Sequence, residues 1–206
     1  MSDPAPLIIH RGWTYRFIVA GIRLVTWFYY PFRIEGFENV PKTGGAVISA
    51  NHASFLDIPG IAHATSPRHV SFVARDSLAE TGWLAMVMRN CGAVLIERGA
   101  SDRKAFRAIG EHLKAGDLVG LFPEGTRSSD GELLEFKKGA VMSAKIAGVP
   151  IIPCGLSGFQ RAWGRGRRIP RPGRLVARFG PPIDASAPDA LEQLRAAVAE
   201  LMRDDR

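Results

Sequence analysis

The sequence predicts one α/β domain with a mixed, largely parallel central sheet of about seven strands flanked by helices. Short apolar runs alternate with helical stretches after Pro31, which is the pattern of strands joined by helical connections. The 206 residues suffice for one buried core, and nothing between residues 33 and 206 resembles a linker. We therefore divide the chain into an amphipathic helix within residues 1–32 and a domain over residues 33–206.

The N-terminal segment 13–32 is apolar and aromatic, and it is long enough to span a bilayer. It also contains Arg16 and Arg23, which are seven residues apart and so share one face of a helix. Each arginine would cost roughly 2.5–3.5 kcal/mol at the centre of a membrane. We expect a helix lying in the membrane interface, with tryptophan and tyrosine rings near its ends. The alternative is a helix that packs its apolar side on the domain.

Within the domain, apolar runs bounded by turn residues predict strands at positions 33–37, 46–50, 70–74, 93–96, 118–122, 151–156 and 175–179. Helical periodicity predicts helices over 56–64, 83–90, 101–116, 140–147 and from about Pro188 onward. Ser101 is expected to cap the third of these helices and Gly116 to end it. Gly148 is expected to end the fourth.

A histidine stands where the predicted strand 46–50 passes into a helix. In open α/β sheets the carboxyl ends of the strands bind ligands, so His52 is placed at the usual site of chemistry. Ser54 is expected to cap the following helix, which lets Asp57 fold back towards the imidazole. A carboxylate on one ring nitrogen fixes the tautomer and leaves the other nitrogen to act as a general base. The alternative is that Asp57 only favours the helix dipole and that His52 makes a structural hydrogen bond.

A second polar turn, residues 122–128 with the sequence FPEGTRS, follows the predicted strand 118–122. Gly125 lets the backbone approach a ligand closely, and Arg127 carries a fork of donors that matches a phosphate. Taken alone, the turn could equally be a solvated loop with an exposed arginine.

The net charge of +7 and the pI near 9.9 indicate an anionic partner. Arginine is concentrated between Arg161 and Arg178, a stretch that includes Trp163 and has no acidic residue. Such a stretch suits anionic lipid headgroups or nucleic acid, and the alternative is a solvated loop. No nucleic-acid-binding motif accompanies it, so a nucleic-acid partner is disfavoured.

Several other kinds of site have no supporting pattern. Cys91 and Cys154 are too few for a zinc site or a disulfide framework, and both are expected to be buried thiols. Neither a Walker A pattern nor a dinucleotide-binding glycine fingerprint occurs. No G-x-S-x-G elbow occurs either, which favours direct attack by an acceptor hydroxyl over an acyl-enzyme. No metal or bound cofactor is expected.

The ordered motifs resemble the glycerolipid acyltransferase family, of the lysophosphatidic acid acyltransferase type. Its N-H-x4-D motif matches residues 51–57, and its G-x-x-x-I-x-R pattern matches residues 92–98. Its F-P-E-G-T-R-S motif is present in full at residues 122–128, and its proline-bracketed apolar strand matches residues 149–153. The resemblance covers roughly residues 33–180, so it spans the whole predicted sheet.

The resemblance implies a role for each matching residue. His52 would be the general base, and Asp57 would orient it. The acceptor and its phosphate would be bound by Arg75, Arg98, Glu124, Gly125, Thr126 and Arg127. Arg75 stands where the family has a lysine, so the charge is kept with a different geometry. The thioester oxyanion needs a donor, for which a backbone amide near residues 150–153 or Lys137, in an F-K-x-G segment, could serve; the sequence does not choose between them.

The resemblance also implies a reaction. A fatty acyl group would pass from acyl-CoA or acyl-carrier protein to the free hydroxyl of lysophosphatidic acid, which gives phosphatidic acid for phospholipid synthesis. The same motifs serve glycerol-3-phosphate, another lysophospholipid or a lyso-aminolipid as acceptor. A non-catalytic lipid-binding module is the alternative of another class. The expected location is peripheral or monotopic, on the cytoplasmic face of the cell membrane.

Overall fold

The structure is a computed structural model that describes residues 13–75, 94–96 and 102–203. The described strands are β1 Phe32–Glu35, β2 Ala46–Ala50, β3 Val70–Arg75, β4 Val94–Ile96, β5 Leu118–Leu121, β6 Ile151–Ser157 and β7 Leu175–Phe179. Each lies within a few residues of a predicted strand, because apolar runs that end at turn residues form the buried strands of a helix-covered sheet.

The described strands form one sheet in the order β1-β7-β6-β2-β5-β3-β4. Hydrogen-bonded neighbours are parallel, except that β6 and β7 are antiparallel. The predicted mixed α/β sheet with flanking helices is therefore confirmed. The parallel strands β2, β5 and β6 occupy the middle, so their carboxyl ends meet at one edge of the sheet.

The helices are α1 Trp13–Tyr29, α2 Asp57–Ala64, α4 Asp102–Lys114, α5 Gly139–Ala147, α6 Phe159–Trp163 and α7 Ala190–Leu201, with a short 3-10 helix η1 at Phe37–Asn39. As predicted, Gly148 ends α5 in the left-handed conformation, with a φ of 66°. The predicted helix 83–90 and the cap at Ser101 lie outside the described residues. The one-and-a-half-turn helix α6 was not predicted, because it is too short to show a periodicity.

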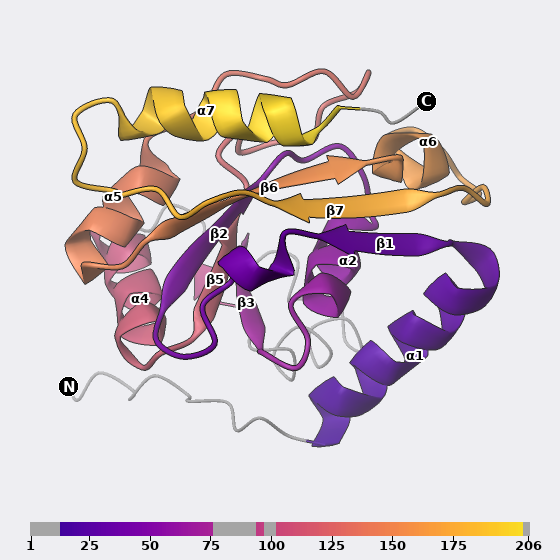
Figure 1. The fold of residues 1–206 in the computed structure, drawn as a ribbon, viewed down its shortest axis with the longest axis horizontal. Coiled ribbons are helices and arrows are strands. Elements are labelled where there is room, and N and C mark those ends of the chain that lie inside the picture. Colours follow the sequence, from indigo (N-terminus) through magenta and orange to yellow (C-terminus); the bar gives the residue numbers. More distant parts are fainter. Residues whose placement is uncertain (1–12, 76–93, 97–101, 204–206) are drawn as a thin grey trace.

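Hydrophobic cores lie on both faces of the sheet, because successive side chains of a strand point in opposite directions. In β2, Ile48 packs with Ile61 of α2 and Phe159 of α6. On the other face, Val47 packs in the core that contains Leu194 of α7 and the buried residues of α4 and α5. Figure 1 shows the sheet between these groups of helices. The end of β2 is thus held from both sides.

Helix α1 lies beside α2 at the β1 edge of the sheet (Figure 1). Val19 is buried, whereas Phe17, Leu24 and Phe28 are 69%, 57% and 75% exposed. The three exposed side chains are seven and four residues apart, so they share one face of the helix. No helix in the described residues is long and apolar enough to cross a membrane. Helix α1 thus packs with one side on the domain and exposes large apolar side chains on another.

Candidate active site

Asn51, the first residue after β2, ties the two central strands together. Its side-chain amide donates a 3.1 Å hydrogen bond to the carbonyl of Leu156 in β6, and its carbonyl oxygen accepts a 2.8 Å bond from the N–H of Leu156. Asn51 is buried, so these bonds are shielded from water. Sequence reasoning gave this asparagine no role, although an amide directly after a central strand is a signal for such a link.

His52 and Asp57 form the pair that the sequence predicts. Nδ1 of His52 lies 2.8 Å from Oδ2 of Asp57. The carboxylate is an acceptor only, so Nδ1 carries the proton and donates it. Nε2 is then the basic nitrogen, and it has no hydrogen bond within the described part of the chain. The His52 side chain is 17% exposed, so the imidazole is not fully buried.

Asp57 is almost entirely buried, at 1% exposure. Oδ2 also accepts 2.8 Å bonds from the backbone N–H groups of Ala53 and Ser54. Burial raises the pKa of Asp57, and the hydrogen bonds from His52, Ser54 and Ala53 oppose that rise. The carboxylate is therefore fixed by the turn that carries His52, which orients the imidazole.

Ser54 does not cap α2 as predicted. The helix begins at Asp57, and the N-cap position is Leu56, without a side-chain hydrogen bond. The Ser54 hydroxyl instead accepts a 3.0 Å bond from the N–H of Leu56 and donates a 2.9 Å bond to the carbonyl of Trp163. Asp57 itself satisfies the free backbone donors that precede the helix. The serine joins the histidine turn to the end of α6.

The FPEGTRS turn, residues 122–128, follows β5 and contacts His52 through both its backbone and its side chain. The N–H of His52 donates a 2.8 Å bond to Oε1 of Glu124, and the N–H of Ser128 donates a 2.8 Å bond to the carbonyl of His52. The ring of Phe122 stacks on the imidazole with centroids 4.0 Å apart and planes at 16°. Both backbone groups and one ring face of His52 are thus held by this turn.

Glu124 is buried, at 3% exposure, rather than presented on an open surface. Its second oxygen, Oε2, accepts a 3.1 Å bond from the N–H of Leu134. Burial raises the pKa of Glu124, against the lowering effect of these two backbone bonds. Its carboxylate therefore joins the histidine turn to the segment around Leu134.

Gly125, Thr126 and Arg127 form the outer part of the same turn. Gly125 has a φ of 68°, which favours glycine, and a Cβ atom there would lie 3.1 Å from Nζ of Lys137. The Lys137 ammonium thus lies against the turn, and the N–H of Lys137 donates a 2.8 Å bond to the carbonyl of Pro123. Gly125 and Thr126 are exposed. The guanidinium carbon of Arg127 lies 3.9 Å above the ring of Phe55, which is a cation–π contact.

The remaining predicted positions are two arginines and the two cysteines. Arg75 ends β3, where its backbone pairs with that of Ile96 in β4, and its side chain is outside the description. Arg98 and Cys91 lie outside the described residues. Cys154 is buried in β6, and burial raises the pKa of its thiol. In the described ranges, no group of His, Cys, Asp or Glu side chains is arranged to hold a metal ion.

Phe55 and Trp163 are site residues that sequence reasoning missed. Their rings lie 5.5 Å apart, and the N–H of Phe55 donates a 3.1 Å bond to the carbonyl of Trp163. Nothing in the sequence pairs residues so far apart along the chain. Together with Arg127, they form the rim of the site on the side of α6.

Comparison with known proteins places this geometry in a family. The family model described as Acyltransferase matches residues 31–157. The chain is 34% identical to a chloroplastic 1-acyl-sn-glycerol-3-phosphate acyltransferase of Arabidopsis thaliana over 179 residues, which cover 84% of this chain and 50% of that one. It is 23% identical to the 1-acyl-sn-glycerol-3-phosphate acyltransferase of Bacillus subtilis, with 82% of each chain covered.

A solved structure resembles this chain in fold and, in part, in sequence. The crystal structure of the 1-acyl-sn-glycerophosphate (LPA) acyltransferase of Thermotoga maritima superposes with a TM-score of 0.77 at 32% identity. The match covers 91% of this chain and 76% of that one. The chain spans about half the length of the Arabidopsis relative and more than three quarters of the bacterial ones. It belongs to the acyltransferase family.

Proposed function

We propose that this chain transfers a fatty acyl group from a thioester to the free hydroxyl of lysophosphatidic acid, forming phosphatidic acid. The observation that carries the proposal is the 2.8 Å contact of Asp57 with His52 Nδ1, which leaves Nε2 as the basic nitrogen just after the carboxyl end of β2. The relatives that the chain resembles are 1-acyl-sn-glycerol-3-phosphate acyltransferases, which supports this acceptor. Acyl-CoA or acyl-carrier protein serves as donor, and no cofactor takes part.

In the proposed reaction, His52 acts first as base and then as acid. Its Nε2 takes the proton of the acceptor hydroxyl as that oxygen bonds to the thioester carbonyl carbon. The tetrahedral intermediate then breaks its carbon–sulfur bond, and the leaving sulfur receives the proton from the imidazolium. Asp57 holds the ring in the correct tautomer and stabilises its positive charge between these steps.

Positive groups near the second turn would bind the acceptor phosphate. Arg127 has a guanidinium directed by Phe55, and Lys137 has its ammonium against Gly125. Arg127, with Arg75 and Arg98, is proposed for the phosphate, which would bring the hydroxyl to His52 in attacking geometry. Gly125 and Thr126 are proposed to line the same acceptor site. Lys137 is proposed for the thioester oxyanion, because developing negative charge needs a fixed donor.

Glu124 is proposed as a positioning residue within the acceptor site. Its two oxygens already accept the N–H groups of His52 and Leu134. Its contribution to acceptor binding therefore runs through the backbone of the histidine turn.

Peripheral attachment to the cytoplasmic face of the cell membrane is part of the proposal. The exposed face of α1, with Phe17, Leu24 and Phe28, supports insertion into one leaflet. Lysophosphatidic acid is itself held in a bilayer, so an enzyme that acts on it benefits from binding there.

An acceptor panel with acyl-CoA and acyl-carrier protein as donors tests the proposal. Released thiol and labelled phospholipid are measured with lysophosphatidic acid, glycerol-3-phosphate, lysophosphatidylcholine and a lyso-aminolipid. We expect the highest kcat/KM with lysophosphatidic acid. A higher value with another acceptor would reassign the substrate within the same chemistry. Binding of lysophosphatidic acid without thiol release from either donor would instead identify a lipid-binding module.

A further inference from the structure

The loop between α6 and β7, residues 164–174, is strongly cationic. Arg165, Arg168, Arg171 and Arg174 are exposed, and none of them forms an ion pair with a described carboxylate. We call residues 164–174 the arginine loop. Arg178, which ends the arginine-rich stretch in the sequence, does not belong to this surface. It is buried in β7 and bonded to Glu35 at 2.8 Å, so it has a structural role.

Hydrogen bonds give the arginine loop a defined conformation. The N–H of Arg171 donates a 2.8 Å bond to the carbonyl of Ala162, and that of Arg167 donates a 3.2 Å bond to Gly164. The indole N–H of Trp163 donates a 3.2 Å bond to the carbonyl of Arg167. The guanidinium groups are therefore presented from a folded loop rather than from a freely moving chain.

One end of the arginine loop is joined to the rim of the active site. Trp163, which precedes the loop, accepts bonds at its carbonyl from the hydroxyl of Ser54 and the N–H of Phe55. Gly164 forms a β-bridge with Ser54. Ser54 stands two positions after His52 in the same turn, so the loop begins beside the proposed base.

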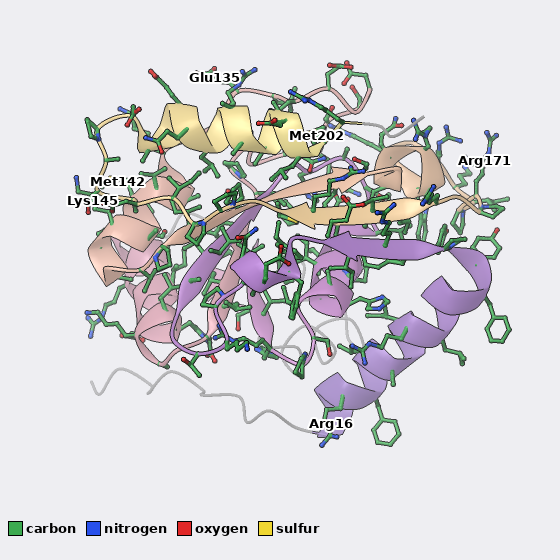
Figure 2. All side chains as sticks on the ribbon, viewed as in Figure 1. Arg16, Glu135, Met142, Lys145, Arg171 and Met202 are labelled. Atoms are coloured by element: carbon green, nitrogen blue, oxygen red, sulfur yellow. The ribbon has the colours of Figure 1, made fainter. Side chains whose placement is uncertain are left out.

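The middle of the arginine loop reaches the C-terminal end of α1. The hydroxyl of Tyr29 donates a 3.3 Å hydrogen bond to the carbonyl of Pro170. Figure 2 labels Arg171 next to this end of α1 and Arg16 at the other end of the helix. The loop therefore bridges α1 and the active-site rim.

Exposed apolar side chains occur on α1, on the arginine loop and next to the histidine turn, the three parts that these bonds connect. Ile169 lies among the four arginines and is 76% exposed. On α1, Phe28 and Leu24 are 75% and 57% exposed. Next to the histidine turn, Phe55 and Ile58 are 49% and 44% exposed. Large apolar side chains that gather on one surface, next to basic ones, are typical of a membrane contact.

We propose that the arginine loop binds the headgroups of anionic phospholipids and inserts Ile169 between them, so that α1, the loop and the active-site rim contact one bilayer together. Near a negatively charged membrane, exposed arginine side chains are attracted to the anionic headgroups. The positive charge of the arginine loop complements the negative charge of the headgroups. The apolar side chain of Ile169 would be buried only by an apolar partner such as the bilayer. If the loop binds a bilayer, the acceptor lipid enters beside His52, and this consequence for catalysis rests on the proposed function. The binding of the loop to vesicles does not depend on that function.

A nucleic acid fits this loop less well. Single-stranded nucleic acids bind where aromatic rings stack on bases. The side chain that the loop exposes among its arginines is the aliphatic Ile169, and the indole of Trp163 is turned towards Arg167 and Phe55. A bilayer uses both the guanidinium groups and the isoleucine.

Flotation with vesicles tests the proposal directly. The vesicles contain phosphatidylcholine alone or phosphatidylcholine with phosphatidylglycerol, and the protein carries Arg165→Gln, Arg168→Gln, Arg171→Gln and Arg174→Gln together. A matched control carries Arg107→Gln, Lys114→Gln, Lys145→Gln and Arg195→Gln, which removes the same charge from exposed positions outside the arginine loop. Figure 2 shows Lys145 on the side of the molecule away from Arg171.

We expect the loop variant to bind anionic vesicles at least about tenfold more weakly than wild type, and the control to lose much less. Binding by wild type should fall between low salt and about 0.5 M salt. Arginine-to-lysine changes at the four loop positions should restore binding, and unchanged circular dichroism should show that all variants fold. Ile169→Ser should weaken binding to anionic vesicles without changing its salt dependence.

Equal losses in the loop variant and the charge-matched control would overturn the proposal, because binding would then follow net charge alone. Loss of single-stranded oligonucleotide binding in the loop variant, with vesicle binding unchanged, would overturn it in favour of nucleic acid.

Measurements of enzyme activity separate this inference from the proposed function. The loop variant should keep wild-type turnover of a short-chain acceptor dispersed in water and lose turnover of vesicle-borne acceptor. Absence of turnover in wild type would contradict the proposed function and leave the binding result standing.

Discussion

The backbone N–H of His52 donates a 2.8 Å hydrogen bond to Oε1 of Glu124, so a buried carboxylate fixes the backbone that carries the proposed base. Two segments that are 72 residues apart in the chain are joined at this point. The other oxygen of Glu124 accepts the N–H of Leu134. The position of the imidazole therefore depends on the FPEGTRS turn as well as on Asp57.

Glu124→Gln should lower kcat and leave the KM for lysophosphatidic acid nearly unchanged. An amide nitrogen cannot accept, so one buried N–H, of His52 or of Leu134, loses its partner at a cost of about 1–3 kcal/mol. Steady-state kinetics and urea unfolding measure the two effects. Glu135→Gln, at an exposed position of the same segment, is the control. A raised KM with unchanged kcat would make Glu124 a direct acceptor ligand instead.

The stability of the protein should also depend on pH through Glu124. Burial raises its pKa above the usual 4.5, so the folded chain retains a proton that the unfolded chain has released. This contribution to stability is fully present below the unfolded pKa and is lost as the pH rises through the folded pKa. The stability advantage of wild type over Glu124→Gln should therefore shrink as the pH rises above 4.5 and through the raised folded pKa of Glu124. Urea unfolding across that range measures it, and an advantage that grows with pH would show a lowered pKa.

Phe55→Leu should raise the KM for phosphate-bearing acceptors a few-fold, because Arg127 loses the ring that directs its guanidinium. A cation–π contact at a partly exposed site contributes about 0.5–1 kcal/mol. Arg127→Ala should raise the same KM further. The test compares lysophosphatidic acid with a monoacylglycerol, which has no phosphate. An equal rise for both acceptors would place Arg127 outside the phosphate site.

Asn51→Ala should destabilise the fold more than Asn39→Ala. The first change leaves both the N–H and the carbonyl of buried Leu156 without a partner, at about 1–3 kcal/mol each. The second removes one 2.9 Å bond, to the carbonyl of Phe179, at a half-buried position. Urea unfolding of the two variants decides between them. Equal losses would mean that the link between β2 and β6 is unimportant for stability.

Replacing Phe17, Leu24 and Phe28 of α1 by serine should weaken binding to vesicles, including neutral ones, because the apolar face is lost. The control replaces Leu134, Met142 and Ile146, which are also exposed apolar residues. Figure 2 shows Met142 on the side opposite α1. Co-sedimentation measures both variants. Equal binding by wild type and the α1 variant would remove α1 from the membrane contact.

Sequence patterns predicted the sheet and the His52–Asp57 pair well, because both depend on local rules. Apolar runs that end at turn residues fix the strands, and five residues of spacing on one turn let Asp57 reach the imidazole. Motif matching also grouped residues 51–57 with residues 122–128, and hydrogen bonds join these segments in the structure.

What the sequence could not predict depends on contacts between distant segments. Glu124 was placed at the acceptor by its motif, yet its burial and its bond to the backbone of His52 arise only when β2 and β5 pair. Ser54 was expected to cap a helix, but the carbonyl of Trp163 lies within its reach. The separation of Arg178 from the other arginines follows from the position of Glu35 on β1, which is paired with β7.

The proposed mechanism requires that Nε2 of His52 carries the proton during acyl transfer. Thiol release from an acyl thioester in the presence of lysophosphatidic acid, measured for wild type and His52→Ala at matched circular dichroism, tests it most directly. We expect the substitution to lower kcat by about 10²–10⁴-fold or more, with the fold retained. Near-normal turnover by a folded His52→Ala protein would contradict it.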